Sequence, residues 1–467
     1  RAYENGQPAK PLHYFPWSKT GAKNGELTFV SGHPGTTGRL ATVAELEFSR
    51  DVSYPAVLDR LLGEVAAYEK YMAVSEEQRR AAVDSLAGAQ NSLKAYQGFL
   101  GGLRDPRLMD RKRDEENRMK KAVADDPAKQ AKYGQTWDDI AAAYVEYRKI
   151  LLPYLVFETQ PKFSELAAIA RPLTRLADER GKPNETRLRE YAETKIPSLE
   201  QELFSEAPVT ESLEIVNAAE YLRFAQAKLG GDDPVVKALL RGGSPEEAAA
   251  YYIQGSKLKN VAERKRLAAD PNAVKSSSDT LLEFMRLIDP AAREARKQYE
   301  DRVEAVRTDA AGKMAAIRYA LYGDREYPDA TFTLRLSYGK TVGYKNAAGA
   351  SVPWATDFGG MYQRATGKPP YDLPARWAKL PAGLNPKTPF NFVSTHDTHG
   401  GNSGSPTVNT RGEIVGILFD GNLEGLPNRF VFRDERERSV HLASQAILEA
   451  LKKVYRADRV VKEIEGR

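Results

Sequence analysis

The spacing of the apolar residues changes twice along the chain, and each change marks a change of predicted secondary structure. Between Pro11 and Leu46, short apolar runs alternate with turns. In this part the run Leu27–Gly32 ends at His33-Pro34-Gly35, which predicts a strand closed by a turn. From Phe48 to Tyr322, apolar residues recur at every third or fourth position, which predicts amphipathic helices.

Cap residues indicate where individual helices begin and end. Ser75 is followed three residues later by Gln78, which is the pattern of a capping box. Ser244 is followed directly by Pro245, a residue favoured at the first helical position. Gly323 follows the last helical residue and predicts a C-terminal cap.

A β pattern returns after the helices. Residues 331–337 alternate strictly between apolar and polar types, which predicts a half-buried strand. The apolar runs 414–419 and 430–432 continue this pattern, and the segment 440–455 has the spacing of an amphipathic helix. The chain therefore reads as a short β segment, a long α segment, a second β segment and a terminal helix.

This order favours an α+β fold, with a block of α-helices inserted into a β-barrel enzyme. We expect a β segment of the barrels at 1–46, an inserted α-helical lid domain at 47–325, and a C-terminal β-barrel with a terminal helix at 326–467. A chain of 467 residues is long enough for about three domains.

Composition excludes several classes of function. The chain has 69 Lys and Arg residues against 64 Asp and Glu residues, and this net charge of +5 gives no reason to expect a nucleic-acid partner. No run of 18 apolar residues predicts a membrane span. Cysteine is absent and only five histidines occur, so we expect no disulfide, no metal site and no cofactor.

The segment Gly401-Asn402-Ser403-Gly404-Ser405-Pro406 carries the strongest chemical signal. It resembles the Gly-Asp-Ser-Gly-Gly-Pro loop of chymotrypsin-type serine peptidases, with two changes. Small residues beside Ser403 would let a peptide carbonyl approach the hydroxyl as a nucleophile. The backbone N–H groups of Gly401 and Ser403 would then donate to the oxyanion. The alternative interpretation is a β-turn that happens to contain serine.

A nucleophilic serine needs a general base, and the sequence offers no convincing one. The five histidines are His13, His33, His396, His399 and His441. His396 and His399 precede Ser403 on its own loop and should point away from its proton. His33 fits a His-before-Ser order, but it lies in a Gly-Pro turn that more simply closes a hairpin. We interpret His13 as part of an aromatic patch, and His441 as a structural residue at the start of the terminal helix.

The chain resembles the dipeptidyl-peptidase 7 and 11 family of bacterial serine exopeptidases. The resemblance is carried by Leu27–Arg39, Asn91–Gly98 and, above all, Ser394–Asn422. It implies a chymotrypsin-like double β-barrel with a large helical insertion. It also implies that the catalytic His and Asp precede this sequence, so that these residues lack the N-terminal part and two members of the triad. We therefore expect very low turnover from the 467 residues alone.

The resemblance also implies three substrate-binding residues. Asn91 would bind the free α-amino group of the substrate, and Asp420 would pair with the same ammonium. Gly421 would leave the P1 pocket open to aliphatic or aromatic side chains, where an arginine would favour acidic ones. The alternatives are a buried helix residue for Asn91 and a turn residue for Asp420. Asp397 competes with this interpretation, because an acid six residues before the serine selects Arg or Lys in trypsin-like enzymes.

These features support a serine exopeptidase that releases dipeptides from the free N-terminus of oligopeptides through an acyl-enzyme on Ser403. One alternative is a catalytically idle peptide-binding protein on a peptidase scaffold, and another is a helical interaction module. The resemblance implies oligopeptide substrates, a homodimer, and location in the periplasm or at the cell surface of a Gram-negative bacterium.

Overall fold

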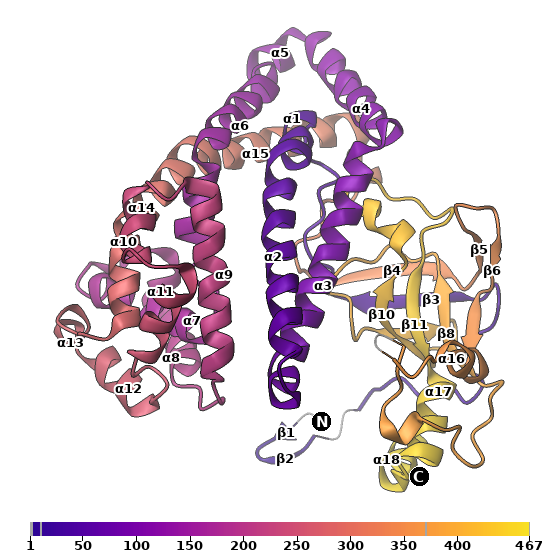
Figure 1. The fold of residues 1–467 in the computed structure, drawn as a ribbon. Coiled ribbons are helices and arrows are strands. Elements are labelled where there is room, and N and C mark those ends of the chain that lie inside the picture. The colour runs from indigo at the N-terminus through magenta and orange to yellow at the C-terminus, as the bar shows by residue number, and fades with distance from the viewer. Residues whose placement is uncertain (1–2, 10–11, 369–370, 467) are drawn as a thin grey trace. The chain divides into compact units, whose positions relative to one another are not determined.

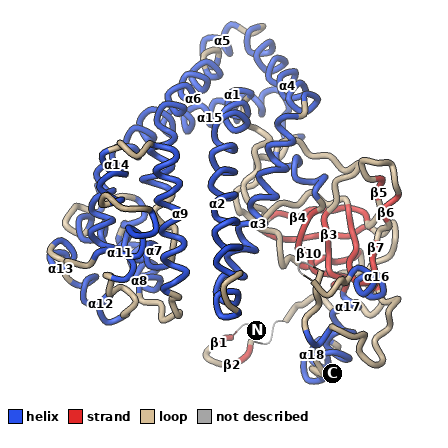
Figure 2. Tube along the Cα trace, viewed as in Figure 1, coloured by secondary structure: helices blue, strands red, loops and turns tan. Residues whose placement is uncertain are grey.

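The computed structural model describes residues 3–9, 12–368 and 371–466 (Figure 1). Pro11, where the predicted β segment begins, lies outside the described residues. The chain divides into two compact units. The β unit combines Arg1–Ala41 with Arg325–Arg467, and the helical unit is Thr42–Asp324. Figure 2 shows strands in one and helices throughout the other, which confirms the mixed α and β class.

The helical unit is built almost entirely of α-helices. Its α-helices are α1 Val43–Phe48, α2 Tyr54–Met72, α3 Glu76–Arg104, α4 Pro106–Ala124, α5 Pro127–Tyr133, α6 Thr136–Pro153, α7 Glu165–Glu179, α8 Ile196–Leu203, α9 Glu211–Leu229, α10 Pro234–Leu240, α11 Pro245–Gln254, α12 Val261–Ala269, α13 Pro271–Lys275, α14 Thr280–Tyr299 and α15 Ala305–Tyr322. Short 3₁₀ and π segments extend or join them: η1 Ser49–Ser53, η2 Tyr154–Thr159, η3 Asn184–Thr186, η4 Arg189–Tyr191, η5 Glu193–Lys195 and η6 Glu300–Glu304; η7 Gly323–Arg325 follows α15.

Several helix ends agree with the cap signals in the sequence. The Ser75 hydroxyl accepts a hydrogen bond from the backbone of Gln78, and Ser244 forms a complete capping box with Glu247. Gly323 takes a positive φ of 62° directly after α15, where an L-residue with a side chain would be strained. These local signals are confirmed because they depend only on neighbours in the sequence.

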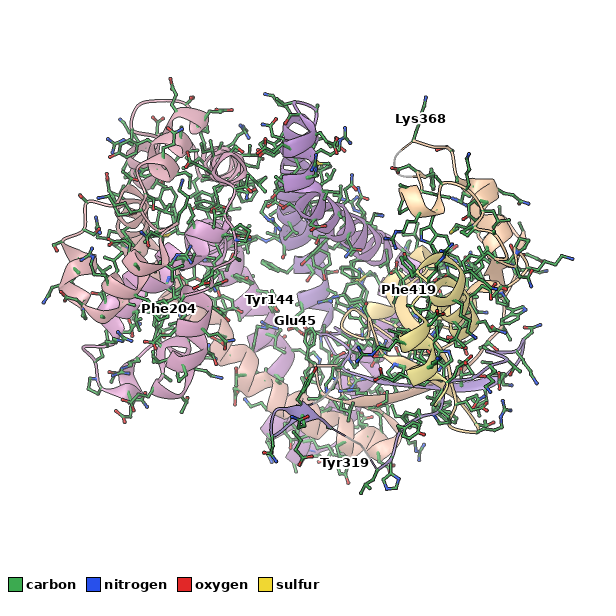
Figure 3. All side chains as sticks on the ribbon, turned by 90° about the horizontal axis from the view of Figure 1, so that it is seen from below. Glu45, Tyr144, Phe204, Tyr319, Lys368 and Phe419 are labelled. Atoms are coloured by element: carbon green, nitrogen blue, oxygen red, sulfur yellow. The ribbon has the colours of Figure 1, made fainter. Side chains whose placement is uncertain are left out.

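The large buried cluster of the helical unit gathers apolar residues between Val156 and Ala292, which belong to η2, α7 and the helices that follow. At the start of the unit, the hydroxyl of Tyr144 in α6 donates to the Glu45 carboxylate in α1 at 3.2 Å (Figure 3). The unit is therefore held by this large apolar cluster, by smaller separate ones, and by polar contacts between distant helices.

The β unit contains a seven-stranded antiparallel sheet, with the strand order β4-β3-β9-β10-β11-β8-β7 in the described residues. Its strands are β3 Leu27–Gly32, β4 Arg335–Lys340, β7 Ala355–Asp357, β8 Pro389–Ser394, β9 Pro406–Asn409, β10 Ile414–Gly421 and β11 Ser439–Ala443. The remaining strands are β1 Tyr3–Glu4, β2 Gln7–Pro8, β5 Tyr344–Lys345 and β6 Ser351–Val352; its helices are α16 Phe358–Arg364, η8 Ala375–Trp377, η9 Leu423–Arg429, α17 Ser444–Glu449, η10 Ala450–Val454 and α18 Asp458–Ile464.

Strand β4, at one end of the strand order, also contacts the chain directly after β8. The backbone N–H of Thr395, directly after β8, donates to the carbonyl of Lys340 at the end of β4 at 3.0 Å. A Cβ atom at Gly339 would lie 2.7 Å from the backbone nitrogen of His396, so only glycine allows this approach. The sheet therefore curls until β4 reaches the end of β8.

The strand predicted at 331–337 is wrong in its bounds and in the face that it buries. Strand β4 runs from Arg335 to Lys340, and Leu336 and Tyr338 are 68% and 71% exposed. The buried position on this strand is Gly339, whose close approach to β8 fixes the inward face. Since side chains alternate along a strand, the apolar residues must then face outward.

Two other predicted elements in the β unit are also wrong. Residues 430–432 follow the 3₁₀ helix η9 and form no strand. The segment predicted as one helix from Val440 begins as strand β11, and helix α17 starts only at Ser444. His441 therefore lies in a central strand, where tertiary pairing with β8 and β10 outweighs the helical spacing.

Candidate active site

Ser403 lies on an exposed turn between β8 and β9, flanked by glycines with positive φ. Gly401 has a φ of 105° and Gly404 a φ of 90°, a backbone region that favours glycine. The side-chain oxygen of buried Asn402 accepts a hydrogen bond from the backbone of His399 at 3.1 Å, and the Ser405 N–H donates to the Asn402 carbonyl at 2.9 Å. These bonds fix the turn locally.

The segment that follows β3 supports the turn from one side. The backbone N–H of Gly35 donates to the carbonyl of Gly400 at 2.6 Å. A Cβ atom at Gly401 would lie 2.5 Å from the His33 carbonyl oxygen. The predicted turn 33–35 is therefore in direct backbone contact with the serine loop, a contact that sequence spacing could not indicate.

The Ser403 hydroxyl points toward strand β10. The hydroxyl donates to the Phe419 carbonyl at 3.1 Å. Phe419, labelled in Figure 3, is the residue at which a β-bulge shifts the pairing of β10 with β11. Asp420 and Gly421 follow the bulge and pair with Val440 and Ser439. Bulges redirect side chains beside active sites, and this one brings Ser403 to the strand that carries Asp420 and Gly421.

The two candidate oxyanion donors are the backbone N–H groups of Gly401 and Ser403. Among the described residues, the backbone N–H groups of Gly401 and Ser403 have no hydrogen-bond partner, whereas those of Asn402 and Gly404 donate to carbonyls at 3.0 and 2.8 Å. Unpaired N–H groups on both sides of an exposed hydroxyl are available to an external acceptor.

Asp420 and Gly421 are both exposed at the end of β10. One carboxylate oxygen of Asp420 accepts a hydrogen bond from the Gly421 N–H at 2.8 Å, and within the described residues the other oxygen accepts none. A Cβ atom at Gly421 would meet only the Arg438 carbonyl, at an ordinary 3.5 Å. The alternative of a hairpin-turn role for Asp420 is wrong, because the strand continues through it.

Asn91 lies in α3 of the helical unit, and its side chain is exposed. The alternative of a buried polar helix residue is therefore wrong. An exposed amide in the middle of a long helix can donate to and accept from a ligand.

Two of the five histidines form a buried relay inside the sheet. His396 Nε2 lies 3.0 Å from the Thr28 carbonyl, and its Nδ1 lies 2.6 Å from the Ser394 hydroxyl. The same hydroxyl lies 2.6 Å from His441 Nε2, and His441 Nδ1 lies 2.7 Å from the Thr407 hydroxyl. A carbonyl only accepts, so His396 donates from Nε2, Ser394 donates to His396, His441 donates to Ser394, and Thr407 donates to His441.

This arrangement keeps both rings neutral. Burial lowers the pKa of His396 to about 4 and lowers that of His441 well below its usual value, because removal from water disfavours the charged imidazolium. These histidines are therefore part of the interior, not of the catalytic machinery.

The remaining histidines do not reach the Ser403 hydroxyl either. His399 is partly buried, and burial together with the charges of Arg429 and Arg39 lowers its pKa to about 4. His13 and His33 are exposed, so the packing role expected for His13 is wrong. Within the described part of the chain, the hydroxyl of Ser403 bonds only to the Phe419 carbonyl.

Asp397 forms an ion pair that the sequence did not reveal. The guanidinium of Arg39 donates to both of its carboxylate oxygens, through Nη2 at 2.6 Å and through Nη1, and the Tyr327 hydroxyl donates to Oδ2 at 2.6 Å. Arg39 lies 358 residues earlier in the chain, so no local signal could have identified this pair.

Other kinds of site receive no support from the described residues. In that part of the chain no three His, Asp or Glu side chains gather in a way that could hold a metal ion. None of the helices that the structure describes combines the length and apolar character needed to cross a bilayer.

Comparison with known proteins identifies the class. The fold resembles the crystal structure of Porphyromonas endodontalis DPP11 in complex with the dipeptide Arg-Glu, with a TM-score of 0.78 and 19% sequence identity over all of this chain and 68% of that one. A second structure of DPP11 from the same organism, in an alternate conformation, matches with a TM-score of 0.65 over all of this chain and 67% of that one. A family model described as Peptidase S46 matches residues 1–466. The chain belongs to the Peptidase S46 family, which confirms the resemblance to the dipeptidyl-peptidase 7 and 11 enzymes.

Relatives with curated names agree with this assignment. The chain is 26% identical to an Asp/Glu-specific dipeptidyl-peptidase of Shewanella putrefaciens, over 99% of this chain and 68% of that protein. It is 25% identical to dipeptidyl-peptidase 7 of Porphyromonas endodontalis, over 99% of this chain and 57% of that protein. The chain thus spans between about half and two thirds of the length of these relatives.

Proposed function

We propose that the protein is a serine exopeptidase that releases dipeptides from the free N-terminus of oligopeptides, with Ser403 as the nucleophile. The observation that carries this proposal is the exposed Ser403 hydroxyl beside the bulge of β10, in a chain that matches the Peptidase S46 family from end to end. The unpaired N–H groups of Gly401 and Ser403 are the proposed oxyanion donors.

The reaction would follow the usual order for acyl transfer. Ser403 attacks the carbonyl of the second residue, the oxyanion is stabilised by the two N–H groups, and the amine leaves to give an acyl-enzyme that water hydrolyses. None of the five histidines accepts the Ser403 proton among the described residues. The proposal therefore assigns the general base and its orienting acid to residues outside these 467, as the resemblance implies.

Asn91 and Asp420 are the proposed ligands of the substrate's α-ammonium group. An ammonium donates three hydrogen bonds, and an exposed amide oxygen together with a carboxylate would accept two of them. A carboxylate at a fixed distance from the nucleophile would select peptides whose free N-terminus lies two residues before the cleaved bond. It would not bind a blocked N-terminus.

Gly421 is the proposed determinant of the P1 residue. It has no side chain, and the space for a Cβ is free of close contacts, which favours aliphatic or aromatic P1 residues. Several relatives are named Asp/Glu-specific dipeptidyl-peptidases, so acidic P1 is the competing specificity. The proposal further includes export to the periplasm or cell surface and a homodimer, both by resemblance.

The deciding experiment measures cleavage of fluorogenic dipeptide reporters with free and with blocked N-termini. The full-length protein should cleave only the free-amine reporters, and Ser403→Ala should lower kcat by at least about 10³-fold. Ser351→Ala, in the exposed strand β6, is the matched control and should match the unsubstituted protein. Equal cleavage of blocked reporters would contradict the exopeptidase assignment.

Since no histidine in the described residues bonds to the Ser403 hydroxyl, a second candidate is a peptide-binding protein that has lost catalysis. That candidate predicts that the folded full-length protein binds oligopeptides with free N-termini but releases no product. Calorimetric titration with a non-fluorescent tripeptide, run beside the activity assay, separates the two.

A further inference from the structure

Asp397 lies next to the segment proposed to form the P1 pocket. The hydroxyl of Thr398, its neighbour, lies 2.5 Å from the Ser439 hydroxyl, and Ser439 pairs with Gly421 across the sheet. Asp397 also precedes Ser403 by six residues on the same loop. A carboxylate in this position would attract a basic P1 side chain if its charge were available.

That charge is not available, because both carboxylate oxygens of Asp397 are occupied. Oδ1 accepts from Arg39 Nη2 at 2.6 Å, while Oδ2 accepts from Arg39 Nη1 and from the Tyr327 hydroxyl at 2.6 Å. Arg39 and Asp397 are only 16% and 24% exposed, so solvent screens the pair weakly. A fork-to-fork pair is the strongest geometry that an arginine and a carboxylate can adopt.

Arg39 is held in this position from several sides. Its Nε donates to the Asn428 carbonyl at 2.9 Å, and its guanidinium lies 5.6 Å from the centre of the Phe432 ring. Burial alone would lower the pKa of Arg39, but the hydrogen bond and charge of Asp397 raise it. The guanidinium is therefore permanently charged, and Arg39 cannot leave Asp397 by losing a proton.

The backbone of Arg39 is fixed by a carboxylate from a distant part of the chain. Asp329 accepts hydrogen bonds from the backbone N–H groups of Arg39 at 2.8 Å and of Leu40 at 2.9 Å, and from the hydroxyl of Thr37. The guanidinium is thus presented by a rigid turn, and little further entropy is lost when it binds Asp397.

The pair borders an open cavity. Arg39, Asp397 and Tyr327 line a cavity of about 870 Å³, and Asn402, which precedes the nucleophile, lines it as well. A cationic side chain that entered this space would meet the positive charge of Arg39 and a carboxylate of Asp397 that already accepts three hydrogen bonds.

We propose that Arg39 is a specificity-determining residue of the β unit. Its guanidinium neutralises the charge of Asp397 in the same protein, and this excludes basic side chains from the P1 pocket. This inference rests on the proposed function, because it concerns the substrate choice of the same site. It explains how an acid can stand at the trypsin-like position without selecting Lys or Arg.

The first test removes the charge on each side of the pair in the full-length protein. Arg39→Met keeps the apolar stem beside Phe432 and should raise kcat/KM for Lys at P1, relative to Leu at P1, by at least tenfold. The added substitution Asp397→Asn should abolish that gain. Asp397→Asn alone removes the carboxylate charge that neutralises Arg39 and should raise the relative kcat/KM for Glu at P1 by a similar factor.

Arg411→Met is the matched control, since its guanidinium donates to the Glu413 carboxylate and, among the described residues, Arg411 is not part of the cavity lining. Its P1 preference should equal that of the unsubstituted protein. The inference is overturned if both single variants remain folded and cleave Leu reporters with an unchanged charge preference. It is also overturned if the gain of Arg39→Met survives Asp397→Asn.

A second measurement does not depend on catalysis. Benzamidine, a small amidinium probe, should bind Arg39→Met at least tenfold more tightly than the unsubstituted protein, as followed by calorimetric titration. The Arg39→Met/Asp397→Asn variant should lose this binding. If no variant cleaves any reporter, the proposed function fails, and the benzamidine titration alone decides whether Arg39 shields Asp397.

Discussion

At the scale of single residues, the serine loop depends on two glycines with positive φ, and at one of them neighbouring backbone also leaves no room for a side chain. Gly401 combines a φ of 105° with a space that the His33 carbonyl and the Gly35 amide nitrogen fill. Gly404 has a φ of 90°, but open space surrounds the position of its missing Cβ. Substitutions at these two glycines therefore distinguish the cost of backbone strain from the cost of a steric clash.

Gly401→Ala should destabilise the β unit by about 1–3 kcal/mol from the backbone conformation, with a further loss from the clash with His33. Gly404→Ala carries only the first cost and is the matched control. Thermal unfolding followed by calorimetry measures both. Equal Tm values for the two variants would contradict a direct contact between the turn 33–35 and the serine loop.

Gly421→Arg should shift the P1 preference of the full-length enzyme from aliphatic toward acidic residues. The arginine would place a cation in the proposed pocket, and the backbone at this position requires no glycine, so the variant should fold. The measurement compares kcat/KM for Leu and Glu at P1, with an expected change in the ratio of at least tenfold. Gly421→Ala controls for the added bulk, and an unchanged ratio in Gly421→Arg would remove Gly421 from the specificity site.

At the scale of elements, a local signal starts the helical unit. Thr42 is the N-cap of α1: its hydroxyl accepts a hydrogen bond from the Glu45 N–H, and the Glu45 carboxylate accepts from the Thr42 N–H at 2.8 Å. The Tyr144 hydroxyl of α6 also donates to the same carboxylate. One cap thus links the first helix of the unit to a later one.

Thr42→Ala should lower the free energy of unfolding of the helical unit by about 1 kcal/mol, because the Glu45 N–H loses its acceptor. Thr42→Ser keeps the hydroxyl and should recover most of the loss. Urea unfolding monitored by circular dichroism gives both values. No difference between the alanine and serine variants would show that the cap does not stabilise the native state.

Two segments show where a sequence pattern alone does not predict the secondary structure or its buried face. The alternation at 331–337 identifies a strand, but its buried face is fixed by the approach of Gly339 to the end of β8. The apolar spacing from Val440 fits a helix, but residues 439–443 pair on both sides with neighbouring strands. In both segments the decisive partner lies far away in the sequence.

At the scale of the whole molecule, the two units should respond differently to acid. All five histidines fall outside Thr42–Asp324, and burial lowers the pKa values of His396 and His399 to about 4. In the unfolded chain these rings take up protons near pH 6.5, whereas in the folded unit they do so only near pH 4. The unfolded state therefore binds more protons in this window, and stability falls as the pH falls.

The β unit should lose up to about 1.4 kcal/mol per buried histidine for each pH unit between 6.5 and 4. Carboxylates of the helical unit such as Glu190 and Asp289, although burial alone would raise their pKa values, have them lowered by arginine partners. Their contribution is lost only below about pH 4.5, by the same linkage.

Hydrogen exchange by mass spectrometry at pH 6.5 and 5, corrected for intrinsic rates, should show faster opening in 328–466 than in 54–322. Equal acceleration in both ranges would contradict this assignment.

The sequence by itself determined what depends on neighbours and on periodicity. It identified the β–α–β order, the caps at Ser75 and Ser244, the end of α15 at Gly323, and the loop around Ser403, because each is a short pattern with its own physical cause. It also carried the resemblance to the family that the whole-chain match then showed.

Only the tertiary structure decided which distant groups meet. It paired Arg39 with Asp397, brought the turn 33–35 against Gly401, and buried His396 and His441 in one hydrogen-bonded relay. Sequence spacing cannot supply these contacts, because the helical unit of more than 280 residues separates the strands that form the sheet. A charged residue can be identified in a sequence, but whether its charge is available depends on the partner that folding places beside it.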